Sequence, residues 1–272
     1  MDGADPDRWS AVAAGWAQLW GGSARPAWDA VLEASGVGAG ARVLDVGCGA
    51  GDLLAHLDRL GLTAAGVDPA PGMVAYARDR VPAADVRLGG AEELPWPDGS
   101  FDLVISVNAL HFAEDVPAAL AELARVTVPG GHVAVANWAE ASRNDLDTLE
   151  AAVARAAGEE PQPDPESRLP GGLRRLLTDG GLDVVSAGLV ELPWTAPDDA
   201  TLVRGVLLGE DPDTIAATAP VVLAAARPFR TTEGGYRLVN AFRYAVARTG
   251  AVAAPQRGSL TADRDLPGWG LV

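Results

Sequence analysis

The sequence has no lysine, only one cysteine and a deficit of basic side chains. All 21 basic residues are arginine, against 37 aspartates and glutamates, which gives a net charge of −16. Without lysine, Schiff-base chemistry and a P-loop lysine are excluded. The single cysteine, Cys48, cannot form an internal disulfide, which is typical of a reducing compartment. The acidity disfavours nucleic-acid and anionic-membrane partners, because both require a basic surface.

Long hydrophobic runs are also missing. The longest uncharged stretch, Trp9–Ala24, is shorter than the ~20 residues that span a bilayer, and glycine and glutamine interrupt it. Aspartates stand near the start of the chain, where a secretory signal has basic residues. Hydrophobic residues make up 48% of the 272 positions, enough to form a core. We expect a cytoplasmic monomer or homodimer that acts on a small molecule and contacts neither nucleic acid nor membrane.

Short apolar strands alternate with helix-like segments in the first half of the chain. Strands are predicted at residues 42–46, 63–67, 86–88, 101–106 and 132–136, the last after a turn at Pro129-Gly130-Gly131. This alternation indicates a Rossmann-like α/β fold, with helices on both faces of a parallel sheet. The second half is less regular, with predicted helices and two further strands, Asp183–Leu192 and Tyr236–Ala247.

The pattern predicts a single domain over residues 1–248. Within it we distinguish an N-terminal helical lid, a cofactor-binding half and a substrate-pocket half with helical insertions, at residues 1–36, 37–138 and 139–248. Residues 249–272 are rich in glycine, proline and alanine, and they are predicted to form a loosely packed tail.

A glycine-rich turn after the first strand is the strongest functional signal. Gly47, Gly49 and Gly51 stand where a strand turns into a helix, and Asp68 ends the next strand. Glycines let a ligand approach the backbone closely, and a carboxylate at the end of the second strand can accept hydrogen bonds from ribose hydroxyls. The geometry therefore predicts a ligand that contains a nucleoside.

The acidic residues around this turn bear on which nucleoside binds. Asp52 stands where a dinucleotide-binding fingerprint has its third glycine, and Asp45 lies on the strand before the turn. A carboxylate in the first helical turn repels a pyrophosphate. The two acids suit an ammonium or sulfonium group better, and they disfavour a nicotinamide-dependent oxidoreductase.

Taken together, four motifs resemble the class I S-adenosylmethionine-dependent methyltransferases, in the group that includes ubiquinone- and menaquinone-biosynthesis type enzymes. They are Val43-Leu44-Asp45-Val46-Gly47-Cys48-Gly49-Ala50-Gly51, Gly66-Val67-Asp68-Pro69 with Met73, the stretch from Gly90 to Asp102, and the stretch from Glu122 to Gly131. The resemblance covers roughly residues 40–137. It implies a seven-stranded sheet whose last strand is antiparallel and adjacent to the sixth, and S-adenosylmethionine as the cofactor.

The resemblance also implies roles for individual residues. The cofactor would be bound by Asp45, Gly47, Cys48, Gly49, Asp68, Pro69, Met73, Ala91, Glu92 and Asn108. Among these, the two glycines, Asp45 and Asn108 would lie along the methionine part, and Asp68 would bind the ribose. Met73 would pack on the adenine, and Ala91 and Glu92 would flank it. Gly90 departs from the pattern, because many relatives have an acidic residue there. No metal site is predicted.

Candidate acceptor residues are aromatic. Trp9, Trp16 and Trp20 fall on one helix face, either to dock an N-terminal helix or to line a lid over the substrate. Trp16, Trp20 and Trp138 are predicted to line the acceptor pocket. His111, just after the fourth strand, is the candidate general base and also a candidate substrate contact. Arg227, Arg230 and Arg243 could bind a carboxylated acceptor or could simply be solvated.

These features predict a methyltransferase that modifies an oxygen or carbon of a small hydrophobic metabolite, in natural-product biosynthesis for instance. Two alternatives share the cofactor pocket: an enzyme that catalyses a cyclisation or rearrangement without methyl transfer, and a non-catalytic binding module. The nicotinamide-dependent oxidoreductase is a further, disfavoured alternative.

Overall fold

The computed structural model describes residues 5–250, and its centre is one sheet of seven strands. The strands are β1 (Arg42–Val46), β2 (Thr63–Asp68), β3 (Asp85–Leu88), β4 (Phe101–Val107), β5 (Thr127–Trp138), β6 (Asp183–Ala196) and β7 (Tyr236–Arg248). Their order is β3-β2-β1-β4-β5-β7-β6, and β7 runs antiparallel to both of its neighbours. The Rossmann-like prediction, with an antiparallel last strand beside the sixth, is confirmed.

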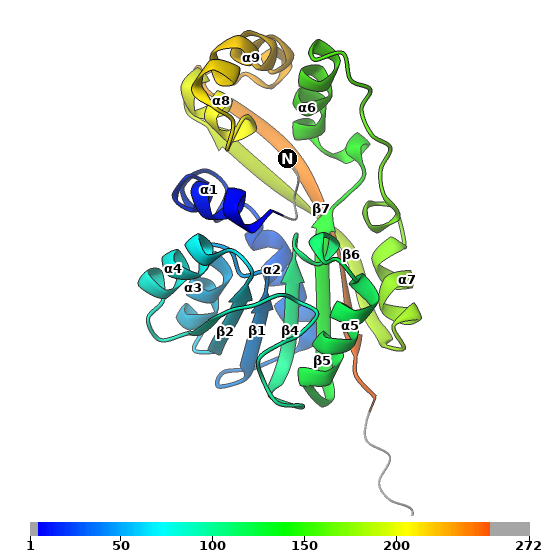
Figure 1. The fold of residues 1–272 in the computed structure, drawn as a ribbon. Coiled ribbons are helices and arrows are strands. Elements are labelled where there is room, and N and C mark those ends of the chain that lie inside the picture. Colours follow the sequence, from blue (N-terminus) through cyan, green and yellow to red (C-terminus); the bar gives the residue numbers. More distant parts are fainter. Residues whose placement is uncertain (1–4, 251–272) are drawn as a thin grey trace, which may run out of the picture.

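Helices cover both faces of the sheet (Figure 1). The helices of the described chain are α1 (Pro6–Leu19), α2 (Arg25–Ser35), α3 (Asp52–Arg59), α4 (Pro71–Arg80), α5 (Val116–Val126), α6 (Asp145–Ala156), α7 (Gly172–Asp179), α8 (Asp199–Val206) and α9 (Pro212–Ala225). Apolar residues of α2, α3 and α4 pack on one face. Those of α5 and α7 pack on the other. Burial on both faces explains why β1, β2 and β4 are nearly continuous apolar runs rather than alternating ones.

One predicted turn is wrong. Pro129-Gly130-Gly131 was expected to precede the fifth strand, but β5 already begins at Thr127. Phe101 of β4 pairs with Thr127, and Leu103 pairs with His132, so the intervening residues of β5 form a bulge. Gly130 has a φ of +78°, which a residue without a Cβ adopts easily.

The strands β6 and β7 continue beyond the main sheet as a two-stranded ribbon. Pairing of β7 with β5 ends at Phe242, whereas pairing with β6 continues to Tyr236 opposite Ala196. The helices α6, α8 and α9 pack on this extension around a separate core, at the top of Figure 1. We call these three helices with the ribbon the cap.

Helix α1 lies between the carboxyl ends of the parallel strands and the cap (Figure 1). Helix α2, in the same predicted lid segment, instead packs on the sheet and buries Ala27, Trp28 and Val31. Within residues 5–250, no helix is long and apolar enough to cross a membrane. Nearly all of the predicted tail, from residue 251, lies outside the described residues.

Candidate functional site

A cavity of about 480 Å³ lies at the carboxyl ends of the parallel strands. One wall of the cavity consists of residues at and just after the ends of β1, β2 and β4, the residues that follow β3, and the last residue of β5. Residues of α1 and of the α1–α2 connection form the opposite wall. The strand order reverses between β1 and β4, and ligands of open α/β sheets bind at such a switch point. The cavity therefore lies where the sequence predicted a ligand.

The β1–α3 turn forms one wall, and its glycines are required by close approaches. Gly47 has a φ of +79°, and a Cβ there would lie 2.2 Å from the Cβ of Ala109. Gly51, also with a φ of +79°, packs against α4, where a Cβ on Gly51 would lie 3.0 Å from the Cβ of Ala77. The turn can therefore lie against both the β4 connection and α4, which leaves its backbone amides beside the cavity.

Asp68, at the end of β2, is buried and oriented by the backbone. One carboxylate oxygen accepts a hydrogen bond from Gly49 N–H at 2.8 Å, and the other accepts one from Ala70 N–H at 2.9 Å. Burial raises the pKa of Asp68, and the two hydrogen bonds partly oppose this rise. Each oxygen keeps a free lone pair, so the group can still accept hydrogen bonds from the hydroxyls of a ribose.

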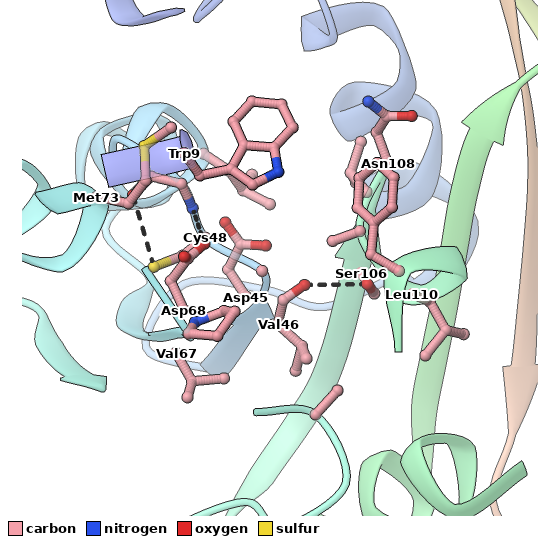
Figure 2. A pocket seen from close by; sticks show the side chains of 18 of the residues that line it. Trp9, Asp45, Val46, Cys48, Val67, Asp68, Met73, Ser106, Asn108 and Leu110 are labelled. Atoms are coloured by element: carbon pink, nitrogen blue, oxygen red, sulfur yellow. Dashed lines mark hydrogen bonds between the residues drawn. The ribbon is translucent and has the colours of Figure 1, made fainter. Parts of the chain in front are cut away.

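Asp45, in β1, has a different environment. It is buried beside the cavity, and no hydrogen bond to its carboxylate is recorded among the described residues. Burial, followed by the charges of Asp68 and Asp52, raises its pKa to about 8. A cationic ligand beside Asp45 would favour its ionised form, because an opposite charge counteracts desolvation. Figure 2 shows the carboxylates of Asp45 and Asp68 on the same side of the pocket.

Asn108 is a further polar residue at the β4 end of the cavity. Among the described residues it is the one non-glycine with positive φ, +54°, and its N–H donates to the carbonyl of Ala136. Its side-chain oxygen is buried without a hydrogen-bond partner in the part of the chain that the structure describes. An unpartnered acceptor and an unpaired carboxylate fit a ligand with a cationic donor, such as the ammonium group of an amino acid.

The surroundings of Asp52 differ from those that the sequence predicted. Its carboxylate forms an ion pair with Arg80 of α4 at 2.7 Å, so its charge is already compensated. It also lies under Gly21 in the α1–α2 connection, where a Cβ would come within 2.4 Å of an Asp52 oxygen. Asp52 therefore packs closely against the α1–α2 connection, and its charge alone does not select a cationic cofactor.

The end of the cavity below the cap is aromatic. Trp9 packs edge-on against Trp16 at 5.2 Å, and Trp16 stacks on Trp20 at 6.4 Å, which confirms the predicted stripe on α1. Trp20 stacks on Trp194 of β6 at 4.6 Å, and its indole N–H donates to the carbonyl of Gly205. The ring contacts and this bond attach α1 to the cap.

Trp138, predicted to line the acceptor pocket, does line the cavity. It packs edge-on against Trp20 at 6.3 Å and against Phe242 of β7 at 4.7 Å. The sequence analysis missed Trp28 and Phe242, which also line the cavity. Neither stands near a recognisable motif, so only the folded chain brings them to the pocket.

His111 lies beside the cavity rather than in it. It belongs to a short 3-10 helix, Leu110–Phe112, whose other two residues line the cavity while the His111 side chain is exposed. Its ring packs against Phe112 at 3.9 Å. Although much of the side chain is exposed, desolvation and the smaller effect of Arg168 lower its pKa to about 4. Its predicted roles as a base and as a substrate contact stay predictions without geometric support.

The other predicted cofactor residues also line the cavity, from the β1–α3 turn, from the segment between β2 and the first turns of α4, and from the segment after β3. The lining includes Cys48, Gly49, Pro69, Met73, Ala91 and Glu92. Cys48 is buried, and burial raises the pKa of its thiol, so it is a packing residue rather than a nucleophile.

A glycine turn and a buried carboxylate at the switch point of the sheet are the arrangement by which many α/β proteins bind nucleosides. Residues 44–135 match the methyltransferase domain family. Malonyl-[acyl-carrier protein] O-methyltransferase of Yersinia pestis is 42% identical over 104 residues, which are 38% of this chain and 39% of the relative. The sequence similarity to methyltransferases is confined to the cofactor-binding half of the chain.

The chain spans about two fifths of the length of the curated relatives it matches first. The solved structure of YcgJ from Bacillus subtilis has a TM-score of 0.55 and 18% identity, and covers 82% of this chain and 97% of YcgJ. The [4+2]-cyclase SpnF has a TM-score of 0.53 and 20% identity, and covers 83% of this chain and 80% of SpnF. These similarities show a shared fold.

Proposed function

We propose that the protein transfers a methyl group from S-adenosylmethionine to an oxygen or carbon of a small, apolar and uncharged acceptor. The observation that carries this proposal is the division of one cavity into an acidic end and an aromatic end. The acidic end is built from the strand ends that carry the family motifs, and the aromatic end from α1, Trp138 and Phe242.

The residues of the acidic end fit the three parts of S-adenosylmethionine. Asp45 and the side-chain oxygen of Asn108 would take the charged amino-acid part, and the free lone pairs of Asp68 would take the ribose hydroxyls. When bound, the cofactor supplies an electrophilic methyl group on a sulfonium. The task of the protein is then to hold an acceptor in line with that group and to exclude water.

The charges of the side chains that line the cavity favour an uncharged acceptor. Every charged residue that lines the cavity is acidic, namely Asp45, Asp52, Asp68, Glu92 and Glu114. Arg227, Arg230 and Arg243, the possible contacts of a carboxylated acceptor, do not line the cavity, and Arg243 is paired with Glu140 at 2.6 Å. A carboxylated acceptor would be desolvated here without a cationic partner, which is costly. The malonyl group named for the Yersinia pestis relative carries such a carboxylate, so we propose a different acceptor class.

Calorimetry followed by product analysis tests the proposal. We expect binding of S-adenosylhomocysteine and no binding of NAD. In a panel of aromatic alcohols and the matching carboxylic acids, with S-adenosylmethionine present, we expect products heavier by ~14 mass units from the alcohols alone, because a carboxylate lacks a cationic partner. NAD binding without S-adenosylhomocysteine binding would contradict the cofactor assignment. Turnover of an acceptor without a gain in mass would favour a cyclisation instead.

A further inference from the structure

Three indole N–H groups at the cavity have no assigned role. Trp16, Trp28 and Trp138 all line the cavity. Within residues 5–250, no hydrogen bond is recorded for the N–H of any of these three rings. An indole nitrogen can only donate, and a buried tryptophan usually finds an acceptor for it. The three groups are therefore donors that a ligand in the cavity could satisfy.

Two neighbouring tryptophans show where an N–H of the same region serves the fold instead. Trp20 donates to the carbonyl of Gly205 at 3.1 Å, and Trp194 donates to the carbonyl of Leu19 at 2.6 Å. Both bonds join the α1 end to the cap, because each runs between these two parts of the chain. The structural role of an indole in this cluster thus comes with a backbone acceptor, which the three rings at the cavity lack.

The surroundings of the three rings differ. Trp16 packs with Met73 beside the acidic end, and Trp28 packs with Leu54 of α3. Trp138, the last residue of β5, packs instead with the residues at the junction of the main sheet and the cap. Of the three N–H groups, that of Trp138 therefore belongs to the end of the cavity where the acceptor is proposed to bind.

The neighbours of the Trp138 ring offer its N–H nothing to bind. Trp138 stands directly opposite Phe242 in the β5–β7 pairing and contacts that ring at 4.7 Å, and it contacts Trp20 at 6.3 Å. Both contacts are edge-on and apolar, and the side-chain oxygen of Asn137 is taken by the backbone N–H of Trp138. The rest of the ring borders the cavity, so the acceptor for the indole N–H must come from there.

We propose that the methyl acceptor carries an uncharged carbonyl oxygen that accepts a hydrogen bond from the indole N–H of Trp138. This inference rests on the proposed function, because it places the acceptor at the aromatic end. A carbonyl oxygen supplies the missing lone pair and brings no donor of its own. A CH₂ group in its place would leave the N–H unpaired in an apolar site, which costs free energy. Trp138 therefore selects an aryl ketone over a hydrocarbon of the same shape.

Pairs of phenols that differ in one group test the proposal by calorimetry, with saturating S-adenosylhomocysteine. One member of each pair carries C=O and the other CH₂ at the same position, as in 4-hydroxybenzophenone and 4-benzylphenol, and the pairs increase in size. Measurements near pH 6 keep both phenols protonated. Wild type is expected to bind the ketone of the best-fitting pair about three- to tenfold more tightly, as for one hydrogen bond. In Trp138→Phe, this preference should fall below about twofold.

Trp194→Phe is the matched control, because it removes an indole N–H from the same aromatic cluster at a residue that does not line the cavity. It should keep the wild-type preference. Lost packing weakens the binding of both members of a pair alike, so a purely structural role of Trp138 would leave the preference unchanged. An unchanged preference in Trp138→Phe would overturn the proposal, as would an equal fall in Trp194→Phe.

The indole N–H signals of ¹⁵N-labelled protein provide the second test. The signal that is missing from Trp138→Phe should move downfield when the ketone binds and should move less with the CH₂ member. A downfield shift confined to another indole, such as Trp16 or Trp28, would overturn the proposal. Equal affinities for the two members of every pair would also overturn it and leave the proposed function intact. Binding of S-adenosylhomocysteine without binding of any phenol would instead contradict the proposed acceptor class.

Discussion

The two ends of the cavity are built in different ways. The acidic end comes from one continuous stretch, residues 45–114, and backbone turns and hydrogen bonds fix it. The aromatic end joins α1, Trp138 and Phe242, which are far apart in the chain, and ring packing holds it together. Substitutions at the acidic end should therefore act first on cofactor binding, and substitutions at the aromatic end on stability and on the acceptor.

The largest effect is expected for Trp20→Ala. Trp20 is 5% exposed, stacks on Trp194 and donates its indole N–H to Gly205. Removing the ring leaves a cavity between α1 and the cap, which should lower the free energy of unfolding by about 3–5 kcal/mol. Urea unfolding measures this loss.

Trp20→Phe is the control, because it keeps a six-membered aromatic ring and loses the N–H donor with the smaller ring of the indole. It should cost less than half as much as the alanine variant. A loss below about 1 kcal/mol for Trp20→Ala would contradict the view that ring packing attaches α1 to the cap, because a well-packed buried ring costs more.

This contrast explains what could be predicted from the sequence. The glycine turn was predictable, because a tight turn from a strand into a helix favours residues without a Cβ. Asp68 was predictable, because a carboxylate that binds ribose stands at the end of the second strand. The stripe from Trp9 to Trp20 was predictable because a helix has a fixed period. Trp194 and Phe242 were not, because their neighbours depend on how far β6 and β7 extend beyond the sheet. The ion pair of Asp52 with Arg80 also depends on tertiary packing.

Asp68→Ala tests the acidic end. The variant removes the proposed ribose acceptor and leaves the amides of Gly49 and Ala70 without their partner. The affinity for S-adenosylhomocysteine should fall by about 1.5–3 kcal/mol, as for hydrogen bonds to a charged group. Titration calorimetry gives the value, with Asp102→Ala, a half-exposed carboxylate outside the cavity, as the control. Wild-type affinity in Asp68→Ala would exclude the ribose role.

Gly21→Ala tests how the two ends are joined. A Cβ at this position would lie 2.4 Å from an oxygen of Asp52, so the α1–α2 connection or the carboxylate must shift. We expect a loss of about 1–3 kcal/mol in unfolding free energy, as for overpacking. The adjacent Gly22→Ala is a matched control, because a Cβ there has no neighbour within 4 Å. Equal melting temperatures for the two variants would refute the contact.

Ionisation of Asp45 should couple pH to stability at the acidic end. Burial raises its pKa from 3.8 to about 8, so the folded state binds the proton more tightly than the unfolded state. The stabilisation is complete below about pH 4 and is lost as the pH rises toward about 8. Relative to Asp45→Asn, wild type should therefore lose unfolding free energy between pH 6 and pH 8. A difference that does not vary with pH would show that Asp45 titrates normally.

The smallest effect is expected for His111→Gln. The side chain is exposed beside the cavity, and its pKa near 4 makes it a weak base at neutral pH. If the acceptor is held by the aromatic end alone, kcat should change by less than twofold and the pH profile between pH 6 and pH 9 should keep its shape. A drop of about a hundredfold, typical of a lost general base, would instead place His111 in contact with the acceptor. That outcome would mean that the short helix Leu110–Phe112 turns its histidine into the cavity when the acceptor binds, and that the aromatic end includes a titratable group.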